Sequence, residues 1–266
     1  MPISDLFSLK GKVVLITGAT NGIGKAMAQA LYEAGASVIL THRPATDPSS
    51  TVQLLRESYP GSEAKIGTIE VDLGEVKIED LEARIFRPAL ESSPTGEIDI
   101  LINNAGITNR DSIVDGSIEE YHRVLHVNLL VPSELTKLVA RRMISQKIRG
   151  KILFTASLTS FRAASNLSAY TTSKGAILQF AKSCAVEWAQ FGINVNCIGP
   201  GYIRTNMTTF HTTDEAREAR ILSKIPRGRW GTPEDFKGPV VFLCSAASDY
   251  VDGECLMVDG GFLALM

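Results

Sequence analysis

The sequence predicts an α/β fold in which a parallel sheet is covered on both faces by helices. Short apolar segments of strand length alternate with longer segments of helical period along the 266 residues, which is the pattern of such a sheet. A glycine-rich turn, residues 17–24, follows the first apolar segment. No Pro/Ser-rich linker, internal repeat or low-complexity tract interrupts the pattern, so we expect one domain over residues 1–266.

The first βαβ unit comes early in the chain. Residues 13–17 form an apolar run, residues 23–34 have helical period, and residues 37–41 form a second short run rich in apolar side chains. A strand, a helix and a parallel strand are therefore expected in this order.

The same alternation continues toward the other end of the chain. Further strands are expected near residues 65–71, 98–102, 151–155, 194–198 and 255–258, with helices near 75–90, 117–146, 169–190 and 233–247. The connections between them are short except for residues 200–229, which are polar, contain four closely spaced threonines and include a predicted short helix. A long connection of this kind is often a lid over a site; residues 200–229 are called the lid below.

Composition excludes several classes of partner. The formal net charge is −2 and the isoelectric point is about 6.1, so no basic excess draws the chain to nucleic acid or anionic lipid. Residues 1–10 lack the apolar core of a signal peptide, and no apolar run nears the roughly 18 residues that span a bilayer. We therefore expect a cytoplasmic protein with neither a membrane nor a nucleic-acid partner.

The cysteines do not form a metal-binding or disulfide pattern. Cys184, Cys197, Cys244 and Cys255 are far apart, without a CxxC pair or a histidine at zinc-ligand spacing. We interpret them as buried thiols in a reducing compartment and expect no metal site.

The glycine-rich turn predicts a nucleotide site. Gly18, Gly22 and Gly24 lie between a strand and a helix, where glycine lets the backbone turn sharply and approach a pyrophosphate that accepts hydrogen bonds from the helix N-terminus. Chance alone produces tight turns in a chain with 22 glycines, so the prediction depends on the βαβ context.

The end of the second strand predicts which cofactor is bound. An acid there reads the ribose of NAD, whereas an arginine reads the 2′-phosphate of NADP. The residues are Thr41, His42 and Arg43, with no carboxylate, which favours NADP(H). NAD(H) stays possible, because His42 could bind a bare ribose and Arg43 could be a solvated side chain. Asp72 could accept a hydrogen bond from the adenine amino group or cap its own loop.

Several short motifs together resemble a known family. The loop 17–24, the run 103–106 (NNAG), Asn128, Ser157, the segment 170–174 (YTTSK) and the pair 200–201 (PG) have the order and spacing found in the short-chain dehydrogenases/reductases. The resemblance covers about residues 9–262. It implies a seven-stranded, doubly wound Rossmann-type sheet, a bound NAD(H) or NADP(H), and a homotetramer, or a homodimer, built through two long helices.

The resemblance also assigns the residues that contact the cofactor. Pro200 and Gly201 would bend the chain around the nicotinamide, with Ile203 and Thr205 beside its carboxamide, and residues 103–106 would hold the end of the fourth strand against the cofactor. The expected cofactor-binding set is Gly18, Thr20, Asn21, Gly22, Ile23, Gly24, His42, Arg43, Asp72, Leu73, Asn104, Ala105, Gly106, Tyr170, Lys174, Pro200, Gly201, Ile203 and Thr205.

Ser157, Tyr170 and Lys174 can carry a proton transfer to or from a substrate oxygen. Tyr170 and Lys174 are four residues apart on a predicted helix, so their side chains can meet. A phenol with a pKa near 10 is a poor base at neutral pH, and we expect the Lys174 ammonium and an oxidised nicotinamide to lower that pKa. Ser157 follows the fifth strand, where it can donate a hydrogen bond to the substrate oxygen.

Each of these residues also has a structural interpretation. A Tyr and a Lys at this spacing occur on many helices, and Ser157 could end a strand. The resemblance assigns Asn128 to a water chain between Lys174 and solvent, although Asn128 could instead brace a helix through backbone hydrogen bonds.

The substrate is less well determined. The segments 225–231, 247–251 and 258–261 resemble those of the 2-deoxy-D-gluconate and gluconate dehydrogenases, which implies a sugar-acid alcohol or ketone as substrate. A carboxylate is well bound by arginine, and Arg110 and Arg162 are the candidates, with Arg204 weaker. Ser157 and Tyr170 would contact the reacting oxygen.

Two alternatives stay open. An NADPH-dependent ketoreductase of a bulkier biosynthetic ketone could use Leu158, Phe161, Met207 and Phe210 as an apolar pocket. A nucleotide-binding regulator could keep the fold without catalysis, although the complete set of Ser157, Tyr170, Lys174 and Asn128 argues against it.

Overall fold

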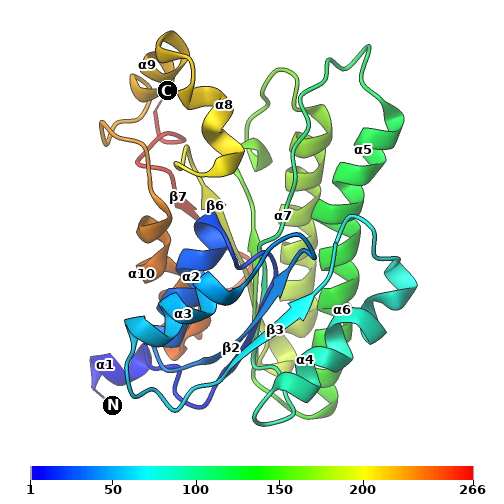
Figure 1. Cartoon of the computed structure of the whole chain (residues 1–266), viewed down its shortest axis with the longest axis vertical. Coiled ribbons are helices and arrows are strands. Elements are labelled where there is room, and N and C mark those ends of the chain that lie inside the picture. The colour runs from blue at the N-terminus through cyan, green and yellow to red at the C-terminus, as the bar shows by residue number, and fades with distance from the viewer. Residues whose placement is uncertain (1, 266) are drawn as a thin grey trace.

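The computed structural model describes residues 2–265 and contains one seven-stranded sheet (Figure 1). Met1 and Met266, the ends of the expected domain, lie outside the described residues. All adjacent strands are parallel, in the order β3-β2-β1-β4-β5-β6-β7. The α/β class and the doubly wound parallel sheet are thus confirmed. The strands are β1 (Val13–Ile16), β2 (Ser37–His42), β3 (Ile66–Glu70), β4 (Ile100–Asn103), β5 (Lys151–Thr155), β6 (Asn194–Pro200) and β7 (Cys255–Val258).

The strand order reverses between β1 and β4. The chain runs outward from β1 to β3, and then returns to place β4 on the other side of β1, where Val14 is level with Ile100. The two connections leave the sheet in opposite directions, so a crevice opens at the carboxyl ends of these strands. The glycine turn follows β1 and therefore lies at this crevice.

Helices pack on both faces of the sheet (Figure 1). Side chains alternate along β1, so Val13 and Leu15 enter one apolar core and Val14 and Ile16 the other. Both faces are covered, which explains why the central strands are apolar throughout. One face carries α2 (Gly22–Glu33), α3 (Ser49–Ser58) and α10 (Lys237–Cys244); the other carries α4 (Arg87–Ser92), α5 (Ile118–Leu125), α6 (Val131–Ser145) and α7 (Ser168–Trp188).

Two expected helices contain a wider π turn. Residues 117–146 form α5, the π turn His126–Leu130 and α6, whereas residues 75–90 include the π turn Glu82–Phe86 before α4. Each π turn is centred four residues before a proline, at Asn128 before Pro132 and at Arg84 before Pro88. Proline has no N–H to donate to the carbonyl four residues earlier, so the regular α ladder cannot continue there.

The connection after β2 is longer than expected, since α3 lies within it. The lid contains a 3₁₀ turn (Asn206–Thr208), α8 (Thr209–Thr212) and α9 (Glu215–Leu222) rather than one short helix. A short helix α1 (Ile3–Leu6) near the start of the chain was also not predicted. Within residues 2–265, no helix has both the length and the apolarity needed to cross a membrane. All four cysteines are buried free thiols.

Candidate active site

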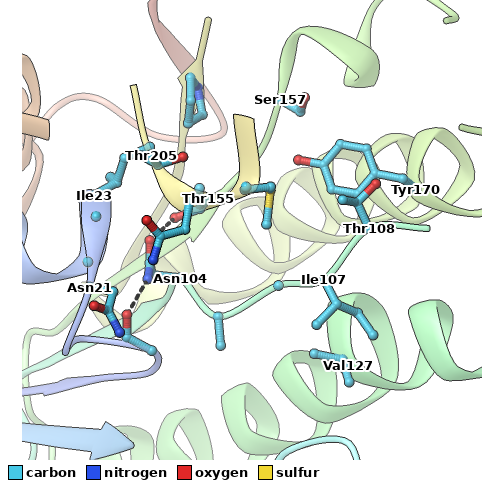
Figure 2. A pocket seen from close by; sticks show the side chains of 18 of the residues that line it. Asn21, Ile23, Asn104, Ile107, Thr108, Val127, Thr155, Ser157, Tyr170 and Thr205 are labelled. Carbon is cyan, nitrogen blue, oxygen red and sulfur yellow. Dashed lines mark hydrogen bonds between the residues drawn. The ribbon is translucent and has the colours of Figure 1, made fainter. Parts of the chain in front are cut away.

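A cavity of about 550 Å³ lies at the carboxyl ends of the strands (Figure 2). Its walls come from the segments that follow β1 to β6, together with α7 and the lid. The topology thus brings residues far apart in sequence to one edge of the sheet. All 19 residues of the expected cofactor-binding set line this cavity, and so do Ser157 and Arg110, whereas Asn128 and Arg162 do not. Among residues 2–265, no group of three or more His, Cys, Asp or Glu side chains could hold a metal ion.

The glycine turn is held tightly against the end of β4. Asn104 Nδ2 donates to the carbonyls of Thr17 and Gly18, both at 3.0 Å, and Thr17 Oγ1 accepts from the backbone N–H groups of Asn104 and Ala105, both at 3.1 Å. A Cβ atom at Gly24 would collide with the Gly18 carbonyl oxygen and the Asn104 amide. Gly18 itself has a φ of +65°, a conformation that glycine adopts without strain.

The N-terminus of α2 faces the cavity with its first backbone N–H groups uncapped. Asn21, the residue before the helix, makes no capping hydrogen bond through its side chain. The first N–H groups of a helix have no partner within the helix, and here Gly22, Ile23 and Gly24 line the cavity. This cradle fits the pyrophosphate of a dinucleotide, because its donors and the helix dipole point to one place.

The adenosine of a dinucleotide is expected beside the end of β2. The side chains there include a basic one and no free acid. His42 is buried, with its Nδ1 3.1 Å from the Arg43 carbonyl oxygen, while Arg43 is exposed at the cavity wall. Arg43 makes no ion pair within residues 2–265. Asp72 Oδ1 accepts from the Gly74 N–H at 2.8 Å, so this carboxylate caps its own loop while it lines the cavity.

Two hydroxyl residues that the sequence analysis overlooked fix the floor of the site. Thr155 Oγ1 donates to Asn104 Oδ1 at 3.3 Å, which links β5 to the loop after β4, as Figure 2 shows. Thr17 makes the equivalent link between β1 and β4. Both threonines stand at or just after the carboxyl end of a predicted strand, and that position is the signal that could have identified them.

Ser157, Tyr170 and Lys174 meet at the other end of the cavity. Figure 2 shows the Tyr170 hydroxyl directed into the cavity with Ser157 beside it. Lys174 Nζ donates to the Thr155 carbonyl at 2.6 Å and lies 5.7 Å from the centre of the Tyr170 ring. Ser157 begins a 3₁₀ turn, in which its Oγ accepts from the Thr159 N–H at 3.1 Å and keeps its own proton available for donation.

Burial moves the pKa values of the tyrosine and the lysine in opposite directions. It raises the pKa of the Tyr170 hydroxyl above its ordinary value, and the neighbouring Ser157 hydroxyl partly offsets this effect. It lowers the pKa of the Lys174 ammonium to about 8, because burial penalises the charged form of each group. The expected lowering of the Tyr170 pKa is therefore not found in the protein by itself, where burial raises this pKa; a lowering by an oxidised nicotinamide stays a prediction.

Asn128 lies behind the cavity wall and braces it. Its Oδ1 accepts from the Ile107 N–H at 2.8 Å, and its Nδ2 donates to the Ile107 carbonyl at 2.9 Å and to Ser173 Oγ at 3.1 Å. The side-chain amide therefore connects the loop after β4 to α7, the helix that carries Tyr170 and Lys174. These hydrogen bonds are the ones expected if Asn128 braces a helix, which is the structural alternative given above.

The three candidate arginines have different surroundings. Arg110 lines the cavity and donates through Nη2 to His211 Nε2 at 2.8 Å. Arg162 is exposed and instead donates to the carbonyls of Leu263 and Leu265, both at 3.1 Å. Arg204 forms an ion pair with Glu218. Of the side chains expected for an apolar pocket, Leu158 and Met207 line the cavity, whereas Phe161 and Phe210 do not.

Comparison with known proteins finds relatives over almost the whole chain. A short-chain dehydrogenase family model described as enoyl-(acyl carrier protein) reductase matches residues 18–263. The 2-dehydro-3-deoxy-D-gluconate 5-dehydrogenase of Bacillus subtilis strain 168 is 44% identical over 264 residues, 98% of each chain. The gluconate 5-dehydrogenase of Gluconobacter oxydans strain 621H is 37% identical over 257 residues, 97% of this chain and 96% of that protein.

A solved structure has the same fold. The crystal structure of a gluconate 5-dehydrogenase from Burkholderia cenocepacia J2315, in complex with NADP and tartrate, matches at a TM-score of 0.84 and 32% identity, with both chains fully covered. Together the sheet, the site and these matches lead to one conclusion: the chain belongs to the short-chain dehydrogenase/reductase family and is an NAD(P)-dependent oxidoreductase that acts on CH–OH groups.

Proposed function

We propose that this protein is an NADP(H)-preferring dehydrogenase that interconverts a secondary alcohol and a ketone on a six-carbon sugar acid. The oxygen at C5 of 2-dehydro-3-deoxy-D-gluconate or of gluconate is the first candidate, because the relatives compared above are named for oxidation at C5. The observation that carries the proposal is Arg110, a cation without an acidic partner in residues 2–265, in the same cavity as Ser157 and Tyr170.

Tyr170 is the proposed acid and base. In the direction of oxidation, the carbinol carbon gives up a hydride to oxidised nicotinamide, and the hydroxyl proton goes to Tyr170 Oη. The products are a ketone, the reduced cofactor and one proton, which leaves through Tyr170 to solvent. Ser157 donates a hydrogen bond to the substrate oxygen, on which negative charge develops when the reaction runs toward reduction.

Lys174 and Asn128 are proposed to support this proton transfer. Lys174 is buried and its pKa is about 8, so both protonation states are populated near neutral pH. It would hold the ribose hydroxyls of the cofactor and relay the proton from Tyr170. Asn128, which forms hydrogen bonds with Ile107 and Ser173, would hold α7 in place against the loop after β4 and support a water chain toward Lys174.

The preference for NADP(H) is supported by the end of β2. Arg43 is exposed at the cavity wall, where its guanidinium is free to bind a 2′-phosphate through two parallel hydrogen bonds. In an NAD enzyme a carboxylate at this place would bind the ribose hydroxyls, and here no carboxylate follows Thr41 directly. The solved relative bound to NADP agrees with this preference.

A substrate panel tests the proposed function. Oxidation of sugar acids and reduction of their 5-keto forms are followed at 340 nm, in parallel with NADP(H) and NAD(H). We expect the highest kcat/KM on a sugar acid and with NADP(H). Higher kcat/KM on cyclic or aromatic ketones, for which Leu158 and Met207 would supply apolar contacts, would instead favour the bulkier ketoreductase reaction and contradict the proposal.

A further inference from the structure

A hydrogen bond joins the lid to the body of the protein at the cavity. Arg110 belongs to the loop between β4 and α5, and His211 belongs to α8 of the lid. Arg110 Nη2 is 2.8 Å from His211 Nε2, and the two residues are 101 positions apart in the sequence. Both line the cavity. The position of the Arg110 guanidinium and the position of the lid are therefore linked.

Two contacts fix the plane of the Arg110 guanidinium. Its central carbon lies 4.5 Å from the centre of the Phe210 ring, which is a cation–π contact on one face. The hydrogen bond to His211 holds one of its edges. A guanidinium carries five N–H donors in a rigid plane, so most of them stay available for a ligand. A carboxylate binds best to such a preoriented edge, through two parallel hydrogen bonds.

The charge around Arg110 favours an anion. The neighbouring Arg217, whose guanidinium carbon lies 4.0 Å from the centre of the same Phe210 ring, is balanced by Asp214 at 3.4 Å. Arg110 makes no ion pair among residues 2–265. Burial and the charge of Arg217 both lower its pKa, which reflects the cost of an uncompensated cation in this place. A bound carboxylate would remove that cost.

His211 must be neutral in this contact. An arginine can only donate, so Nε2 of His211 accepts and the proton resides on Nδ1. Burial and the charges of Arg110 and Arg217 lower the pKa of His211, which favours the neutral ring. Nδ1 is buried and has no hydrogen-bond partner, and the ring packs edge-on against Tyr202 with centres 5.7 Å apart. The histidine is thus held by packing and by Arg110.

We propose that His211 is a positioning residue for substrate recognition: it orients Arg110 toward the carboxylate of a sugar acid. This proposal rests on the proposed function, since it takes the substrate to be a sugar acid. It predicts that substitution of His211 weakens the binding of anionic substrates and leaves the binding of neutral polyols unchanged.

The test uses binding without turnover. Trp230 stacks edge-on against Tyr202, with ring centres 5.4 Å apart, and is one of two tryptophans in the chain. Trp188→Phe therefore leaves Trp230, beside the lid, as the only tryptophan in the chain, and Tyr170→Phe in the same chain prevents turnover. With NADP⁺ bound, D-gluconate and neutral D-sorbitol are titrated against Trp230 fluorescence in backgrounds carrying His211→Phe, His211→Gln or Arg110→Ala.

We expect His211→Phe and Arg110→Ala to weaken gluconate binding by about tenfold or more, since each removes or misplaces a charge-assisted hydrogen bond. His211→Gln keeps an acceptor for Arg110 and should stay within about threefold of the parent, a difference well below one hydrogen bond. Sorbitol binding should not change. His211→Leu replaces His211→Phe if the latter fails to fold.

Gluconate affinity equal to the parent in the His211→Phe or His211→Leu protein would overturn the proposal, as would equal losses for gluconate and sorbitol. Failure of the proposed function looks different. In that case the enzyme with Tyr170 intact would not turn over sugar acids, whereas the His211 variants would still lose affinity for gluconate. In the active enzyme we expect His211→Phe to raise KM for the acid with little change in kcat.

Discussion

Burial at the reactive end of the cavity determines how Tyr170 and Lys174 are protonated. The phenol keeps its proton to higher pH than a free tyrosine, and the ammonium loses its proton near pH 8. A phenol is the form that gives a proton in ketone reduction, and a phenolate is the form that takes one in alcohol oxidation. The two directions of the proposed reaction should therefore depend on pH with opposite signs.

The first prediction is a pH profile. The kcat of alcohol oxidation should rise with pH, by about tenfold per unit below the pKa of Tyr170, because the phenolate fraction grows. The kcat of ketone reduction should be highest at neutral or lower pH and fall as the phenol ionises. Both profiles are measured at saturating cofactor and substrate. Oxidation that is independent of pH from 6 to about 9 would contradict a role for Tyr170 as base.

Arg110 and Arg162, the two arginines that the sequence offers as carboxylate ligands, form a matched pair. Arg110→Ala should lower kcat/KM on the best sugar acid by about tenfold to a hundredfold, the value of a charge-assisted hydrogen bond. Arg162→Ala should leave it unchanged, because Arg162 binds the carbonyls of Leu263 and Leu265 outside the cavity. Steady-state kinetics of both variants decide the matter, and an unaffected Arg110→Ala enzyme would exclude this arginine as the carboxylate ligand.

Among the structural elements, the glycine turn and the start of α2 pack closely against Asn104. The space beside Gly24 is taken by the Gly18 carbonyl and the Asn104 amide, whereas a Cβ at Gly238 in α10 meets nothing within 4 Å. The same substitution at the two glycines should thus have different effects.

Gly24→Ala should weaken NADP(H) binding by at least about tenfold and lower the free energy of unfolding by about 1–3 kcal/mol, because the added methyl group pushes the turn away from Asn104. Gly238→Ala should leave cofactor binding intact and leave stability unchanged or slightly higher, as alanine favours a helix. Cofactor titration and thermal melting provide the comparison. Normal cofactor binding by Gly24→Ala would contradict the close fit of the turn.

The elements differ in how much of them the sequence predicts. The first strand and the start of α2 follow from an apolar run and a glycine turn, and the spacing of Tyr170 and Lys174 follows from one helical turn. The π turns centred on Arg84 and Asn128 were missed, although Pro88 and Pro132 indicate them, because the periodicity of a helix hides a single wider turn. The helix α3 was missed because it is short and only two of its side chains, Thr51 and Leu55, are buried.

At the scale of the whole molecule, strand order brings the parts of the site together. The glycine turn follows β1, the Ser157 segment follows β5 and the lid follows β6, and all three open at one edge of the sheet. The resemblance predicts this convergence. It does not predict the contact between Arg110 and His211, since neither residue belongs to a motif and 101 positions separate them. The raised pKa of Tyr170 depends equally on burial that only the folded chain produces.

The whole molecule is also expected to form a homo-oligomer. Leu130, in the π turn between α5 and α6, and Val186 on α7 are apolar and 49% and 83% exposed. We propose that the long helices carrying them pair with copies of the same chain in a homotetramer, since burial of such side chains is favourable. Sedimentation should give a mass near four times 28.8 kDa, and Val186→Glu should lower it. A monomer at micromolar concentration would contradict the proposal.

The central claim is that the Tyr170 hydroxyl transfers the proton of the reaction. Tyr170→Phe, with its absorbance change at 340 nm and its NADP(H) affinity measured on one preparation, tests this claim most directly. We predict turnover on the best sugar acid reduced by about a thousandfold or more, within the range expected for loss of a general acid, with cofactor affinity and melting temperature close to those of the parent. Turnover that survives at the parental level in this variant would contradict the account.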